Sequence, residues 1–326
     1  MTNVSKFVTK KEELFPNSEV LENTLHISLC FDRGFVMPAG VAIFSIIENN
    51  KNINLHFHLL VSDVPENDLA LFYELNRPNV LITIYHINGD FNINPETLVL
   101  GIPLSTCLRF LIPEVIDQSI TNVMYLDCDI ICYGSLIELV DYDLQNNIAG
   151  VISDSIEMQA RVDSLDYGVK FIKYFNAGVM LVNIHEWRVN NITYKALNMI
   201  NSGKVYRYAD QDVLNILLNG RLHYLNAKFN NKTTLSVYHN VEDENIENTV
   251  IMHYVTPNKP WYLIFNASNF GRYFSQSPWR NTKRYLSPSA SEIRIKSKSL
   301  WQDRKYGEAI TYYLRYLLMK IFNIKF

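Results

Sequence analysis

The chain has 326 residues, a net charge of −3 and 48% hydrophobic residues. This length and composition predict one large folded domain, or one domain with an appendage, and exclude a disordered chain. The polar stretch 1–17 lacks the apolar core of a signal peptide, and no apolar run approaches the roughly 18 residues that a spanning helix needs. We therefore expect a protein that is neither exported nor membrane-spanning.

The four cysteines are scattered, and their spacing matches neither a redox motif nor a zinc knuckle. They are Cys30, Cys107, Cys128 and Cys132. We predict free, mostly buried thiols in a reducing cytoplasm.

Charge is unevenly distributed along the chain. Residues 280–326 contain eleven Lys or Arg and three Asp or Glu, a net of +8, so the preceding part carries −11. A basic tail on an acidic body predicts an anionic partner that meets only the tail.

The first half of the chain alternates between strand-like and helix-like segments. Strands are predicted at 25–31, 55–61, 80–87 and 123–126, and helices at 37–49, 65–77 and 105–116. This β-α-β-α order predicts an α/β fold with an open, mostly parallel sheet covered by helices. Ligands on such sheets bind beyond the carboxyl ends of the strands.

The order is looser in the second half. Strands are predicted at 178–183 and 250–254 and helices at 185–199 and 211–219, with Asp210 as the cap of the last helix. From about Phe270 the composition changes to Ser, Pro, Arg, Lys and aromatic residues. We predict a soft domain boundary there.

The strongest chemical signal is Asp127-Cys128-Asp129, directly after an apolar strand. Two carboxylates at a strand end can turn toward one cation, and a hard divalent ion prefers oxygen ligands. The alternative is a solvated turn. A second signal is His253, six residues before Lys259 with prolines between them. This segment could bring an imidazole to a metal and an ammonium to a phosphate, unless His253 is an ordinary core or surface residue.

Two further segments contain groups suited to sugar hydroxyls. In 175–183, Asn176 offers a donor and an acceptor, and Gly178 could let a substrate approach the backbone closely. The alternative is a turn into a buried strand. In 210–215 a polar triplet begins a helix, where Asp210 could bind a hydroxyl or simply cap the helix.

Together these segments resemble glycosyltransferase family 8, the retaining transferases that include bacterial lipopolysaccharide α-glucosyl- and α-galactosyltransferases. The matching segments are 30–35, Arg109, 125–129, 175–183, 210–215 and 253–261. The tail, with Ser277-Pro278-Trp279 and its basic and aromatic residues, resembles the C-terminal extension of the lipopolysaccharide-core members.

The resemblance implies a GT-A fold, Rossmann-like with a mostly parallel sheet flanked by helices. The catalytic domain would span residues 21–270, after a lead-in of 1–20. A small helical, basic extension would cover 271–326 and associate with the membrane. The resemblance also implies a UDP-sugar donor, a Mn²⁺ or Mg²⁺ ion and retention of anomeric configuration.

By position, the resemblance assigns the metal to Asp127, Asp129 and His253, and catalytic roles to Gln211, Asp210 and Lys259. Contacts with the nucleotide sugar fall to Cys30, Asp32, Phe35, Arg109, Asp127, Cys128, Asn176, Ala177, Asp210, Gln211, His253 and Lys259. Asp32 would meet the uracil, Phe35 the nucleoside and Lys259 the diphosphate. The chain departs from the family pattern at Thr256, usually Gly, and at Gly34, commonly a polar residue.

We predict transfer of glucose or galactose, preferably glucose, to a hexose of the lipopolysaccharide outer core. Front-face attack by the acceptor is favoured, because the Gln211 amide is a poor nucleophile beside a carboxylate. The alternatives are a glycogenin-like self-glucosylating protein and a non-catalytic sugar-nucleotide binder.

We predict no nucleic-acid partner and leave the oligomeric state open. The protein would be cytoplasmic, with the tail docked on the anionic inner face of the bacterial inner membrane. The alternative for the tail is a basic helix pair that packs on the catalytic domain.

Overall fold

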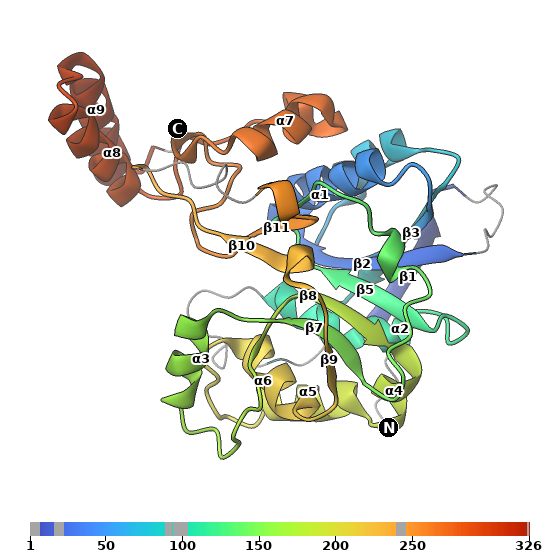
Figure 1. Cartoon of the computed structure of the whole chain (residues 1–326). Helices are drawn as coiled ribbons and strands as arrows, with labels where there is room; N and C mark the ends of the chain where they lie inside the picture. Colours follow the sequence, from blue (N-terminus) through green and yellow to red (C-terminus); the bar gives the residue numbers. More distant parts are fainter. Residues whose placement is uncertain (1–6, 16–22, 89–92, 94–103, 239–245, 325) are drawn as a thin grey trace.

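The computed structural model describes residues 7–15, 23–88, 93, 104–238, 246–324 and 326. The centre of the molecule is a mixed eight-stranded sheet (Figure 1) in the order β1-β4-β3-β2-β5-β8-β7-β9. Its strands are β1 (Val8–Glu13), β2 (Thr24–Asp32), β3 (Asn54–Ser62), β4 (Val80–Ile87), β5 (Asn122–Leu126), β7 (Ala149–Ser153), β8 (Phe175–Asn183) and β9 (Leu222–Tyr224). A small sheet contains β10 (Asn231–Thr233), β11 (Ile251–Tyr254) and β6 (Ile130–Cys132).

The predicted α/β sheet is confirmed, and four neighbouring strands form a parallel block within it. Strands β4, β3, β2 and β5 run parallel to one another, and β9 runs parallel to β7. Three pairs are antiparallel: β1 with β4, β5 with β8, and β8 with β7. Four of the seven pairings are therefore parallel. The carboxyl ends of β2 and β5 meet at one edge, which is where ligands bind on such sheets.

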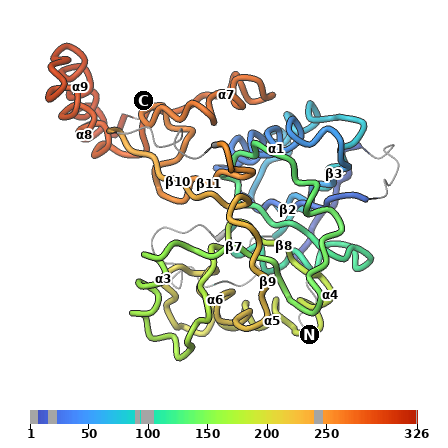
Figure 2. The backbone as a smooth tube through the Cα atoms, in the orientation of Figure 1, coloured from blue at the N-terminus to red at the C-terminus, as the bar shows by residue number. Residues whose placement is uncertain are grey.

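Helices cover both faces of the sheet (Figure 2). One face packs against α1 (Val36–Asn49) and the 3-10 segment η3 (Glu66–Leu75), and α7 (Ser268–Gln276) packs on α1. The other face packs against α2 (Ile112–Val115), α4 (Ile184–Val189), α5 (Ile192–Ile200) and α6 (Ala209–Leu218). Successive strand residues alternate between these two cores: Leu29 and Phe31 enter the first, and Cys30 enters the second.

The remaining helical elements are short connections. They are α3 (Ile156–Asp163), η2 (Arg33–Phe35), η5 (Leu104–Leu111), η6 (Ile137–Leu139), η7 (Ala227–Asn230), η9 (Ile246–Asn248), η10 (Leu263–Phe265) and η11 (Pro278–Asn281). The chain ends in a hairpin of α8 (Ala290–Gln302) and α9 (Tyr306–Phe322), which projects from the body (Figure 1).

Several predicted helices differ from the structure. The helix expected at 185–199 is two helices, α4 and α5, because Asn191 adopts a left-handed backbone with φ of 53°. The segment 105–116 is mostly a 3-10 helix, and only its end, with Pro113 in the first turn, is α-helical. Asp210 does not cap α6 but lies within its first turn. Strands β1, β6, β7, β9 and β10 were not predicted.

The body extends past the predicted change of composition at Phe270. Trp279 is buried, its ring centroid is 4.9 Å from that of Phe72, and a Cβ added to Gly40 would lie 2.2 Å from its ring. The segment up to η11 therefore packs on α1, and only α8 and α9 project. No helix in the described ranges has both the length and the apolar character needed to cross a bilayer.

The prediction for the cysteines is confirmed in its structural part. All four lie in described segments, are buried and form no disulfide.

Candidate active site

Backbone pairing in the small sheet brings the two chemical signals of the sequence together. Asp127 directly follows β5, and Asp129 directly precedes β6. Strand β11 pairs antiparallel with β6, with His253 opposite Ile130, and the Tyr254 N–H donates to the Asp129 carbonyl at 3.0 Å. His253 is thereby held beside two carboxylates that lie more than a hundred residues earlier in the chain.

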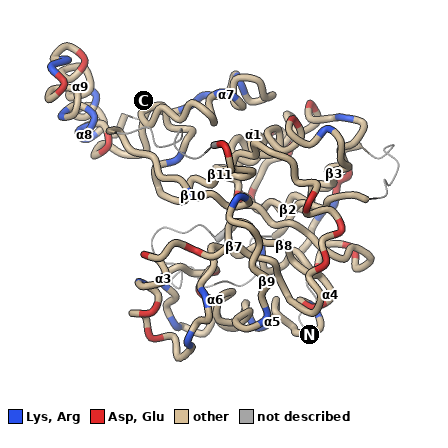
Figure 3. The backbone as a smooth tube through the Cα atoms, viewed as in Figure 1, with Lys and Arg blue, Asp and Glu red and all other residues tan. Residues whose placement is uncertain are grey.

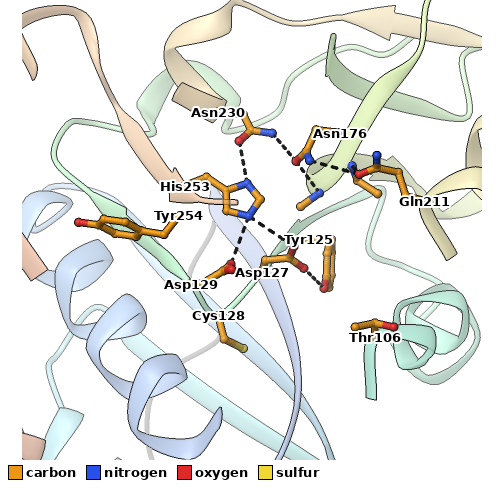
Figure 4. Close-up of polar contacts among 12 residues, drawn as sticks. Thr106, Tyr125, Asp127, Cys128, Asp129, Asn176, Gln211, Asn230, His253 and Tyr254 are labelled. Carbon is orange, nitrogen blue, oxygen red and sulfur yellow. Dashed lines mark hydrogen bonds and ion pairs between the residues drawn. The ribbon is translucent and has the colours of Figure 1, made fainter. Parts of the chain in front are cut away.

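The side chains of Asp127, Asp129 and His253 converge on one point (Figure 4). Nε2 of His253 lies 3.2 Å from Oδ1 of Asp129 and 3.6 Å from Oδ2 of Asp127. Oδ1 of Asp129 is buried and has no hydrogen-bond partner among the described residues. Two carboxylates and one imidazole with an unused buried oxygen could hold a divalent metal ion.

A chain of amides orients the His253 ring (Figure 4). Nδ1 of His253 lies 3.0 Å from Oδ1 of Asn230, whose Nδ2 donates to Oδ1 of Asn176 at 2.9 Å. Because an amide oxygen only accepts, Nδ1 must donate, and Nε2 of the neutral ring keeps its lone pair for the carboxylate side. Asn230 was missed by the sequence reasoning, since it lies in a 3-10 turn with no local pattern.

Gly178 makes room for this arrangement. A Cβ at this position would lie 2.2 Å from Cε1 of His253 and 2.7 Å from Oδ2 of Asp127. We expected a close approach of substrate to the backbone here. In the structure the close approach is made by the protein's own His253 and Asp127.

Asp127 is also held from its other side. Nη2 of Arg109 lies 3.0 Å from its Oδ1, and the Tyr125 hydroxyl donates to the same oxygen at 2.5 Å. Arg109 is buried, and its Nε lies 3.0 Å from Oδ2 of Asp210, while its Nη1 donates to the Ala177 carbonyl. Burial raises the pKa of Asp210, although Arg109 opposes this. One buried cation thus joins Asp127, a candidate metal ligand, to the start of α6.

Gln211 lies beside Asn176 and Ala177, as the resemblance implied. Its Oε1 accepts from Nδ2 of Asn176 at 3.2 Å and from the Ala177 N–H at 3.0 Å. Its Nε2 donates to the Tyr174 hydroxyl at 3.2 Å, which in turn donates to the buried Asp212 at 2.6 Å. Tyr174 and Asp212 were missed as supporting residues, although Asp212 belongs to the polar triplet at the start of α6.

Lys259 closes the site on the side of Asp129. Its Nζ lies 2.5 Å from Oδ2 of Asp129 and donates to the Tyr254 carbonyl at 2.7 Å. Burial alone would raise the pKa of Asp129, but the opposing effects, of which the charge of Lys259 is the largest, lower that pKa below its ordinary value. Asp129 is therefore an anion at neutral pH.

The residues expected to meet the nucleoside lie at the carboxyl end of β2. Asp32 accepts from the Gly34 N–H at 2.8 Å and from the Ser105 hydroxyl at 2.9 Å. The Phe35 ring meets the Trp261 ring edge-on, 5.6 Å between centroids, so this group adjoins the segment that carries Lys259. Cys30 and Cys128 are buried below it, with Sγ of Cys128 3.6 Å from the Cys30 carbonyl oxygen.

The model of one protein family, described as glycosyl transferase family 8, matches residues 26–264. The chain belongs to this family. Its relatives include the lipopolysaccharide 1,3-galactosyltransferase of Salmonella typhimurium, 29% identical over 311 residues and covering 91% of each chain. The lipopolysaccharide glucosyltransferase WaaO of Escherichia coli K12 is 28% identical over 315 residues, again covering 91% of each chain. The resemblance stated from the motifs is therefore confirmed.

A solved structure of the same family shares the fold. The galactosyltransferase LgtC, solved with donor and acceptor sugar analogues, superposes with a TM-score of 0.61 at 26% identity. The match covers 79% of this chain and 99% of that one. The predicted GT-A fold is confirmed.

Proposed function

We propose that this family 8 chain is a retaining hexosyltransferase that moves glucose or galactose from a UDP-sugar to a hexose of the lipopolysaccharide outer core. UDP-glucose is the preferred donor in this proposal. The observation that carries it is the convergence of Asp127, Asp129 and the buried His253 at a strand end, with Lys259 in contact with Asp129. The relatives named above, which match over nine-tenths of the chain, supply the acceptor class.

Asp127, Asp129 and His253 would hold a Mn²⁺ or Mg²⁺ ion. When bound, that ion would supply positive charge where the departing diphosphate becomes negative. Lys259 would turn from Asp129 to a phosphate oxygen and add a second positive charge. With the leaving group stabilised in this way, its departure requires no separate general acid.

Thr256, where the family pattern usually has Gly, adds a hydrogen-bond donor to the proposed diphosphate site. Oγ1 of Thr256 is buried and has no hydrogen-bond partner among the described residues. A buried hydroxyl without a partner is costly, and a phosphate oxygen would satisfy it. We therefore assign Thr256, three residues before Lys259, to the diphosphate.

The donor sugar would lie between the start of β8 and the start of α6, where Arg109, Asn176, Ala177, Asp210 and Gln211 meet. Both ends of the Gln211 amide are held by hydrogen bonds, which supports a positioning role for it at the reacting carbon. The acceptor hydroxyl would attack from the face that the diphosphate leaves, and the leaving phosphate oxygen would take its proton. Asp32, Phe35, Cys30 and Cys128 would contact the nucleoside.

A donor screen with purified core lipopolysaccharide tests this function. UDP-glucose and UDP-galactose are supplied with Mn²⁺, and NMR of the product reads the sugar, its anomeric configuration and its linkage. An α-linked hexose on the core supports the proposal. Sugar that accumulates on the enzyme without added acceptor indicates self-glucosylation, and no UDP release with any acceptor indicates a sugar-nucleotide binder. An inverted product contradicts retention.

The α8–α9 hairpin, the outer part of the extension proposed for 271–326, would dock on an anionic membrane surface. Basic residues run along the C-terminal helices (Figure 3). Large apolar side chains are exposed between them: Trp301, Tyr306, Ile310, Tyr313, Leu314, Leu318, Ile321 and Phe322. Lys and Arg near anionic lipid contribute about 1 kcal/mol each, and aromatic residues suit the headgroup region. This supports a peripheral position on the cytoplasmic face of the inner membrane, where the acceptor would be met.

A further inference from the structure

Three histidines meet on the large sheet, toward the ends of the strands that lie away from Asp127. His26 is near the start of β2, and His56 and His58 are in the first half of β3. The strands pair in parallel with His26 opposite His56, so all three side chains project from the same face. Asp127, by contrast, follows the carboxyl end of the neighbouring parallel strand β5.

This face of the sheet is polar where a buried face would normally be apolar. Farther along the same face, Leu60 and Cys30 belong to the second core. Around the histidines the neighbouring side chains include the buried Ser28 of β2 and the buried Thr83 and Tyr85 of β4. Leu81 of β4, paired with His56, is the apolar exception. Buried polar groups need partners, so the histidine cluster must be satisfied by itself or by a ligand.

The spacing of the ring nitrogens suits a metal ion. Nδ1 of His26 lies 3.0 Å from Nε2 of His58, and the ring centroids of His56 and His58 are 4.0 Å apart. One nitrogen from each of the three rings lies within 4.8 Å of the others. With Zn–N bonds of about 2.0–2.1 Å, two imidazole ligands of a tetrahedral ion are separated by about 3.3 Å. Small ring movements would therefore bring all three nitrogens onto one ion.

Second hydrogen bonds already orient two of the rings. Nδ1 of His58 lies 3.2 Å from the Tyr85 hydroxyl, and Nε2 of His56 lies 2.9 Å from the Thr83 hydroxyl. Metal-binding histidines characteristically donate their other N–H to such an acceptor. Burial lowers the pKa of His26 and of His56 to about 4, so both rings are neutral at pH 7 and keep a lone pair.

The cluster opens on one side to a cavity of about 740 Å³, which His26 and His56 border together with Tyr142 and Asn183. An ion held by the three rings could therefore be reached from this cavity.

We infer that His26, His56 and His58 form a second metal site. The site binds Zn²⁺ or another transition ion that prefers imidazole, and the fourth coordination position of the ion stays open to the cavity. Three imidazoles without a carboxylate distinguish it from the Asp127 site, which suits harder ions. The ion would clamp β2 to β3.

Metal uptake by a full-length double variant, Asp127→Asn with Asp129→Asn, tests this site, because the first candidate site has then lost its carboxylates. After chelator treatment the protein is titrated with Co²⁺ and then with Zn²⁺. We expect one equivalent of Co²⁺ with the intense visible bands of a tetrahedral ion, displaced by Zn²⁺. If the double variant takes up no Co²⁺, the inference is overturned.

Adding His56→Gln to the double variant should weaken Zn²⁺ binding by about 100-fold or more, measured against a competing chelator. His56 borders the cavity, so glutamine can replace it with less disturbance than at the fully buried His58. The matched control is His185→Gln, an exposed histidine outside the cluster, which should change nothing. Equal Zn²⁺ affinity in the His56 and His185 variants contradicts the site.

If His56→Gln does not fold, X-ray absorption at the zinc edge on the loaded double variant needs no histidine substitution. Imidazole nitrogen ligands around the ion are expected there. A shell of oxygen ligands only would overturn the inference.

Discussion

Nζ of Lys259 lies 2.5 Å from Oδ2 of Asp129, so the cation proposed for the diphosphate is paired with a proposed metal ligand when no donor is bound. Lys259→Met should lower turnover about 100-fold, because a positive charge at the leaving group is lost. Mn²⁺ affinity should stay the same or increase, since Asp129 loses a competitor. Steady-state kinetics and calorimetry with Mn²⁺ measure the two effects. A weaker Mn²⁺ affinity would assign Lys259 to the metal site itself.

Removal of a metal ligand should nearly abolish transfer. Asp129→Ala should cost roughly 3 kcal/mol or more of transition-state stabilisation, on the order of 10²-fold in rate, while the fold persists. EDTA treatment of the wild-type protein should have the same effect, reversed by added Mn²⁺. Near-wild-type turnover in EDTA would refute the metal claim, and circular dichroism of the variant controls for folding.

Gly178→Ala should act on the metal site through His253. The added methyl would lie 2.2 Å from Cε1 of His253 and 2.7 Å from Oδ2 of Asp127, so one of them must move. We expect Mn²⁺-dependent UDP binding to weaken about as much as in His253→Ala, read by calorimetry. Gly271→Ala is the matched control, because a Cβ there meets nothing within 4 Å. Unchanged UDP binding in both Gly178→Ala and His253→Ala would mean that His253 is only structural.

Removal of the C-terminal hairpin, α8 and α9, should leave the catalytic body folded. A chain that ends at Ser287 keeps Trp279 on α1 but lacks α8 and α9. It should lose flotation with anionic liposomes yet still hydrolyse UDP-sugar slowly.

A milder variant, Ile321→Ser with Phe322→Ser, should weaken liposome binding, whereas Ile172→Ser, at a still more exposed position on the body, should not. If the full-length protein binds neither anionic nor neutral liposomes at low salt, the docking proposal is wrong.

The histidine cluster should make the metal-free protein sensitive to mild acid. The pKa of His26 and of His56 is about 4 in the folded state because of burial, against about 6.5 when unfolded. Between these values only the unfolded chain binds the protons. The contribution of the two neutral rings to the free energy of unfolding is therefore fully present above pH 6.5 and is lost as the pH decreases to 4. The free energy of unfolding decreases by on the order of 3 kcal/mol for each ring.

Urea unfolding in chelator at pH 7.5, 6 and 5 measures this slope. His26→Gln should reduce it, because one proton-binding group is removed, and His185→Gln should leave it unchanged. A wild-type stability that does not decrease between pH 7.5 and 5 would contradict the buried, neutral state of these rings.

Local pattern determined the elements and the class of chemistry. The strands 25–31, 55–61, 80–87 and 123–126 all occur, because buried strands are apolar whatever their neighbours are. Asp127-Cys128-Asp129 and 253–261 indicated a metal and a phosphate, and the family match agrees with that chemistry. Helix continuity was less predictable, since a single left-handed residue, Asn191, divides a segment whose periodicity is helical throughout.

Only the tertiary structure decided how the site is held. Asn230 orients His253, and Arg109 joins Asp127 to Asp210. These contacts act across 18 to 101 residues of chain, where sequence spacing carries no information about distance. The role of Gly178 likewise depends on which side chains arrive from other strands. The histidine cluster was not predicted for the same reason: His26 and His56 are 30 residues apart, and only the parallel register of β2 and β3 places them side by side.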